Sequence, residues 1–185
     1  MFSDYAEFDD VAAWIEFIKR KIAQMFNDIG ALEPIAIIVP TVHPDTGERM
    51  DVPAMFIVPY EGEVTEMGKS GFAELVRALF KDVKAVAVAF AGEAWAVERE
   101  LKNGDAEEQN KMVNELTGRV ADHPEKIEVV ILTVEHRLMA PKCYMSNILR
   151  SEERAVVAGW SDKSDLLTHS GGRFANFLEQ NHALA

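Results

Sequence analysis

A strict alternation between two kinds of apolar residue over 83–91 constrains the fold of this chain more than any other feature. The alternating residues are Val86, Val88 and Phe90 on one side and Ala85, Ala87, Ala89 and Ala91 on the other. Side chains of a strand point in turn to the two faces of its sheet, so the pattern predicts a strand with an alanine face. Small side chains let a helix or a ligand approach the backbone closely. We expect the first helix of the chain, or the one over 66–81, to bury Ala87 and Ala89.

Apolar periodicity predicts the remaining elements and the fold class. Helices are expected over about 9–29, 66–81 and 172–181, with a further short helix inside a polar segment at about 96–126. Strands are expected over 34–39, 54–59, 83–91, 127–136, 143–149 and 154–160. Short connections among the last three strands favour antiparallel neighbours. The sequence therefore predicts a single α+β domain over residues 1–185. Its amphipathic helices are expected to pack largely on one face of a mostly antiparallel sheet of about six strands.

The first predicted helix carries a single apolar stripe, which is typical of a helix that faces a protein core. The stripe residues, spaced by four and three, are Val11, Ile15, Ile18, Ile22, Met25 and Ile29. Trp14 and Phe26 lie beside this stripe on the predicted helix. Asp9 or Asp10 can cap the start of the helix, and Gly30 suits the left-handed position after its end.

Composition bounds the class of protein. A chain of 185 residues that is 48% hydrophobic can bury a substantial core in one domain. Its net charge of -12 argues against binding to nucleic acid, which needs cationic groups on phosphates, while a protein partner stays open. The single cysteine, Cys143, excludes a disulfide within the chain and fits a reducing compartment. Neither a secretory signal nor a membrane-spanning stretch is visible, so a cytoplasmic location without membrane association is expected.

Common catalytic motifs are absent or incomplete. Gly68-Lys69-Ser70 opens a helix, but Gly62 lies one residue too far upstream for a phosphate-binding loop, and two of the intervening residues are acidic. No Gly-x-Ser-x-Gly turn exists, and Cys143 lies on an apolar strand, as a buried inert thiol does. The five histidines are scattered, which leaves a zinc site at Glu93, His123 and His136 as a weak alternative. We expect no metal and no cofactor.

Strand pairing predicts a cluster of polar residues at one end of the sheet. If the turn between 136 and 142 centres on Met139, Glu128 lies opposite Arg150. Continuing the alternation of the alanine strand brings Glu93 and Trp95 to the same end, unless Gly92 introduces a bulge. The residues expected together are Glu93, Trp95, His123, Glu128, Arg150 and Arg154.

Two interpretations of this cluster are open. Paired carboxylates beside a histidine can perform acid–base chemistry, since like charges push pKa values apart. Glu93, His123 and Glu128 are then the candidate catalytic residues, and Trp95 and Arg150 the candidate ligand-binding residues. In the simpler interpretation, which we favour, the glutamate and arginine of neighbouring strands form an ion pair that only stabilises the fold.

The pattern Ala-Gly-Glu93-Ala-Trp95, a polar insertion and then His123-Pro124-Glu-Lys-Ile-Glu128 resembles a family of uncharacterised bacterial and phage-associated proteins. The resemblance covers residues 85–135, suggests a phage or prophage origin and implies no activity. The leading hypothesis is a small acidic cytoplasmic accessory or interaction protein. The alternative is a hydrolase-like enzyme that uses the glutamates and His123, with or without a metal ion.

Overall fold

The structure, a computed structural model, describes residues 10–43, 45–48, 55–61, 66–97, 124–152 and 154–164. These residues form two helices, α1 (Val11–Ile29) and α2 (Glu66–Asp82), and seven strands. The strands are β1 (Ile35–Val39), β2 (Phe56–Pro59), β3 (Ala87–Ala96), β4 (Ile127–His136), β5 (Met139–Arg150), β6 (Ala155–Val157) and β7 (Ser161–Asp162). The predicted α+β class is confirmed. The helices expected within 96–126 and over 172–181 lie outside the described residues.

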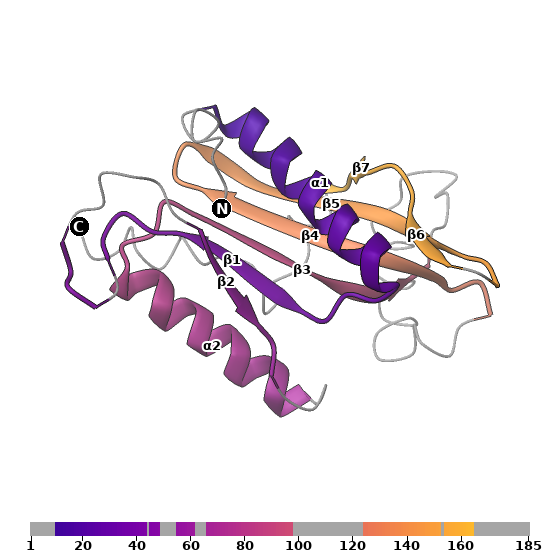
Figure 1. Cartoon of the computed structure of the whole chain (residues 1–185), viewed down its shortest axis with the longest axis horizontal. Helices are drawn as coiled ribbons and strands as arrows, with labels where there is room; N and C mark the ends of the chain where they lie inside the picture. The colour runs from indigo at the N-terminus through magenta and orange to yellow at the C-terminus, as the bar shows by residue number, and fades with distance from the viewer. Residues whose placement is uncertain are drawn as a thin grey trace, which may run out of the picture.

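All neighbouring strands are antiparallel, in the order β2-β1-β3-β4-β5-β6, as Figure 1 shows. The strand β7 pairs with β5 along the same edge as β6. The antiparallel arrangement predicted for the strands after residue 126 is confirmed, although β7, with two residues, is too short to show a sequence pattern. Pairing of β3 with β4 runs without interruption from Ala87–His136 to Ala96–Ile127, so Gly92 introduces no bulge.

The helix α1 begins and ends where its sequence signals predict. The Asp10 carboxylate accepts hydrogen bonds from the backbone N–H groups of Ala12 and Ala13, and Gly30 has a φ of 79°. Ile29, however, is 76% exposed although it belongs to the predicted stripe. The buried residues are Trp14, Ile15, Ile18, Ile22 and Phe26. Burial therefore follows a row with steps of four residues, which is the ridge that a helix presents in an oblique crossing.

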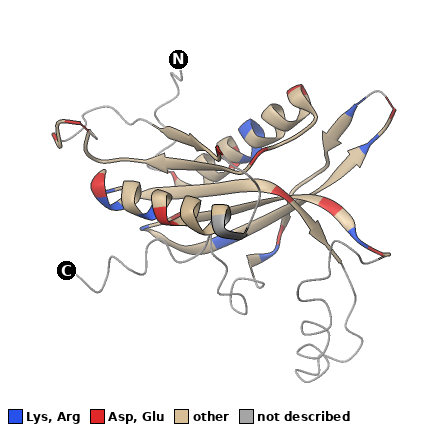
Figure 2. Cartoon of the chain, turned by 90° about the horizontal axis from the view of Figure 1, so that it is seen from below, with Lys and Arg blue, Asp and Glu red and all other residues tan. Residues whose placement is uncertain are grey.

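The two described helices pack on opposite faces of the sheet, which corrects the expectation that the helices lie largely on one face (Figures 1 and 2). The core under α1 contains Ile35, Ile37 and Val39 of β1, and the core under α2 contains Ala36 and Ile38 of the same strand. The sequence of β1, Ile-Ala-Ile-Ile-Val, is apolar at every position, as expected for a strand that is covered on both faces.

The alanine face of β3 is confirmed. Ala87, Ala89 and Ala91 are about 1% exposed and belong to the core under α1, the first helix, while Val88 belongs to the core under α2. The alternation does not extend back to residue 83, because β3 begins only at Ala87. Lys84, with a φ of 47°, turns the chain just before the strand. Ala85 consequently packs with α2, and Val86 packs against the core of α1.

Candidate functional site

Four of the predicted site residues meet at one end of the sheet, near the end of α1, and we call Glu93, Trp95, Glu128 and Arg150 the charged corner. Arg150 lies between the two glutamates. Its Nη2 is 3.2 Å from Oε2 of Glu93, and its Nε donates to Oε2 of Glu128. Charged residues of both signs gather at this end of the sheet in Figure 2. The predicted approach of both glutamates to Arg150 is confirmed.

The pairing register differs slightly from the predicted one. Val129 pairs with Asn147, so extending the register by one residue places Glu128 opposite Ile148 instead of Arg150. The hairpin turns at Arg137 and Leu138, and the register shifts between Val134 and His136. The ion pair of Glu128 with Arg150 is therefore diagonal, which the long arginine side chain can span.

The charged corner also holds the segment that follows α1. Nη1 of Arg150 donates to the carbonyl oxygen of Gly30 at 3.2 Å, and Oε1 of Glu93 accepts from the backbone N–H of Leu32 at 2.6 Å. The pKa of Arg150 is raised, chiefly by its hydrogen bond to Glu128. Both carboxylates are thus engaged by a cation that stays protonated at any ordinary pH. These contacts join β3, β4 and β5 to the end of α1.

Trp95, the one apolar residue of the charged corner, is 42% exposed. It pairs with Glu128 across β3 and β4, and Nζ of Lys126 lies 4.5 Å from the centroid of its ring, at cation–π distance. Arg154 lies in the turn between β5 and β6, where its carbonyl oxygen accepts from the backbone N–H of Ser151. His123, the third candidate catalytic residue, lies outside the described residues.

His136 lies at the opposite end of the sheet from the charged corner. It pairs with Ala87, so six residues of strand, roughly 20 Å, separate it from Glu93, and a zinc site that uses both is wrong. Its Nδ1 accepts from the backbone N–H of Leu138, and its ring lies 6.0 Å from that of Trp14. Burial, and then the charge of Arg137, lowers its pKa. Within the described residues, no group of three or more metal-ligating side chains is found.

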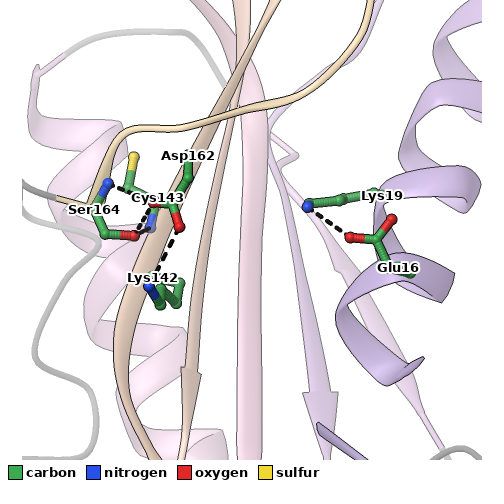
Figure 3. Close-up of polar contacts among 6 residues, drawn as sticks. All are labelled: Glu16, Lys19, Lys142, Cys143, Asp162 and Ser164. Atoms are coloured by element: carbon green, nitrogen blue, oxygen red, sulfur yellow. Dashed lines mark hydrogen bonds and ion pairs between the residues drawn. The ribbon is translucent and has the colours of Figure 1, made fainter. Parts of the chain in front are cut away.

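Cys143 is buried, as predicted, at the edge where β5 pairs with β7 (Figure 3). Burial, with a contribution from the Asp162 carboxylate, raises the pKa of its thiol, which disfavours the reactive thiolate. The Ser164 hydroxyl accepts from the backbone N–H of Cys143 and donates to Asp162. Asp162 also pairs with Lys142 at 3.3 Å. These groups close the sheet edge and leave the thiol without an activating base among them.

An apolar groove of about 230 Å³, which is not among the predicted sites, lies between α1 and the β1–β2 side of the sheet. Its apolar lining comes mainly from Phe17, Met25, Ile37, Met55 and Ile57. Ile57 is 47% exposed. The signal was present in the sequence, since 54–59 is apolar at both parities. Phe56 and Val58 pack with α2. Met55 and Ile57 alternate with them and point to the other face of the sheet, which α2 does not cover.

No family model matches this chain, and no curated protein or solved structure is significantly similar to it. The resemblance to phage-associated proteins therefore stays a prediction. Neither of the two described helices is long and apolar enough to span a membrane.

Proposed function

We propose that this chain is a small interaction protein that acts by holding a partner protein instead of by turning over a substrate. The observation that carries this proposal is the apolar groove beside α1. Apolar side chains gathered around a concavity are a common feature of places that bind a partner or a ligand. An acidic, cysteine-poor chain supports a cytoplasmic setting for this interaction, and a phage or prophage origin remains part of the proposal.

The contacts within the charged corner also favour the interaction hypothesis over the hydrolase hypothesis. A hydrolase that uses Glu93 and Glu128 needs at least one carboxylate that is free to exchange a proton. In the described structure, Arg150 engages both, and Glu93 accepts a backbone hydrogen bond as well. The hydrolase hypothesis depends on His123 and on a rearrangement of these contacts. The interaction hypothesis needs neither.

Size-exclusion chromatography of native cell extract, followed by mass spectrometry of the fractions, tests this function. We expect the full chain to elute in a complex larger than itself, with one partner in a constant ratio, and we expect Glu93→Gln to leave that complex intact. The proposal is contradicted if the chain elutes alone and the purified protein hydrolyses ester or phosphate substrates in a way that Glu93→Gln abolishes.

A further inference from the structure

Among the described residues, neither helix covers the α1 face of the edge strand β2, where Ile57 is exposed. A helix is about 10 Å across and strands lie about 4.8 Å apart, so one helix covers about two strands. α1 contacts β4 and β6, and Lys19 near its middle lies over the ring of Tyr144 in β5. Figure 1 shows α1 over that side of the sheet, whereas β2 and β1 form the other side. The α1 face of β1 is already buried, since Ile35, Ile37 and Val39 belong to the core under α1, whereas Ile57 of β2 is 47% exposed. The groove lies between α1 and β2.

Along α1 the groove is lined by the apolar residues Phe17, Ile18 and Met25 and by the polar residues Lys21, Gln24 and Asp28. Phe17 and Met25 are two turns apart on one side of the helix, and Met55 and Ile57 face them from the β2 side. A strip of apolar side chains along a helix is the surface into which the apolar face of a second helix packs. The edge strand β2 offers less to an added strand, because it has four residues and ends at Pro59, which has no N–H to donate.

The two ends of the groove differ in charge. Asp28 lines the groove in the last turn of α1, a turn without a basic residue, where the helix dipole is also negative. Glu33 and Glu61, both exposed, lie in the segments that flank the same end of β1 and β2. Lys21, farther from this end, lies 5.7 Å from the ring centroid of Phe17. A docked segment would therefore meet Asp28 at one end of the groove and, along its length, apolar side chains together with Lys21 and Gln24.

We propose that the groove binds an amphipathic helix of a partner protein, which packs beside α1 and carries lysine or arginine at the end that meets Asp28. This inference rests on the proposed interaction function and names the chemistry of the partner. A second copy of this chain is a poor occupant, because each copy has a net charge of -12 and would bring like charge to Asp28.

A photo-crosslinking amino acid at position 57 of the full chain, expressed in its native cells, tests the proposal. The same amino acid at Leu138, which is 78% exposed in the β4–β5 turn, is the matched control. Circular dichroism and thermal unfolding verify that both variants fold. We expect one partner to be captured from position 57 only. Its crosslinked residues should lie on the apolar side of a helix with basic residues at one end.

Binding measurements with the captured helix as a synthetic peptide complete the test. We expect Asp28→Lys to weaken its affinity about tenfold, more at low salt than at high salt. The proposal is overturned by crosslinks within one chain, between two copies or to an extended segment, and also by equal capture from position 138. If the native complex persists while position 57 captures nothing, the groove proposal fails and the interaction function stands. If no complex exists, both fail.

Discussion

The charged corner, at the end of α1, and the apolar groove, along α1, lie on the same face of the sheet, and their side chains differ in how fully the fold satisfies them. In the charged corner, Arg150 joins two carboxylates and a backbone carbonyl, so its polar groups are satisfied within the fold. In the groove, Ile57 stays half exposed beside partly buried apolar neighbours. Glu93, Glu128 and Arg150 therefore contact one another and the backbone, whereas Ile57 in the groove keeps an exposed apolar side chain.

The largest effect is expected where α1 and the sheet are tightly packed, at the alanine face of β3. Ala87→Leu should lower the free energy of unfolding by about 1–3 kcal/mol, because added methylenes have no space in a filled core. Ala78→Leu, at an exposed position of α2, is the matched control and should change little. Urea denaturation measures both. An unchanged midpoint for Ala87→Leu would mean that the alanine face is open, so that the groove extends under α1.

Arg150→Met tests the charged corner itself. It leaves two glutamates near each other without a cation and removes the contact with Gly30. We expect a loss of about 1–2 kcal/mol, since the groups are partly exposed and solvent screens them. Arg154→Met, at an exposed position in the next turn, is the matched control. Equal unfolding midpoints for the two variants would show that the charged corner does not contribute to the stability of the fold.

Glu93→Ala separates the two contacts of that carboxylate. Losing the ion pair and the hydrogen bond from Leu32 should cost about 1 kcal/mol and speed hydrogen exchange of the Leu32 amide. A double-mutant cycle with Arg150→Met should give a coupling of about 0.5–1 kcal/mol. If Glu93→Gln were instead more stable than the natural protein near neutral pH, the two carboxylates would repel each other in the folded state. That result would favour the hydrolase hypothesis.

His136 provides a pH test at the end of the sheet away from the charged corner. Its pKa is lowered by burial, so below pH 6.5 the unfolded chain binds the proton before the folded chain does. Stability should therefore fall as the pH drops from 6.5 to the folded pKa of His136, and level off below it. His136→Asn should flatten this part of the curve of unfolding free energy against pH. A curve of the same shape in both proteins would assign the pH response to other groups.

The sequence predicted the fold where local patterns decide it. The alternation around Ala87, the cap at Asp10 and the short connections after residue 126 each specify an element or a pairing. Two features were predicted wrongly. The sequence of β1, apolar at every position, already indicates a strand covered on both faces, so the placement of the helices on opposite faces could have been predicted from it. Ile29 is exposed because α1 crosses the sheet obliquely, and a crossing angle follows from packing, which the helix period alone does not fix.

The candidate site was predicted only in part, for a similar reason. Alternation along β3 placed Glu93 and Trp95 on one face, and pairing brought Glu128 and Arg150 to them. Sequence patterns do not say whether such charges are free or engaged, since that depends on Gly30 and Leu32 from a distant loop. The groove was missed because exposure of Ile57 depends on where α1 lies.

One comparison of unfolding free energies tests the division of roles most directly. Urea denaturation gives the free energy of unfolding of Ile57→Asn, of Arg150→Met and of the natural protein. The contributions of the two regions to stability can then be compared directly. We predict that Ile57→Asn stays within about 0.5 kcal/mol of the natural protein, as for an exposed side chain outside the core. Arg150→Met should lose about 1–2 kcal/mol. The account is contradicted if Ile57→Asn is the more destabilised variant, because the groove would then belong to the core and the charged corner would be free for chemistry.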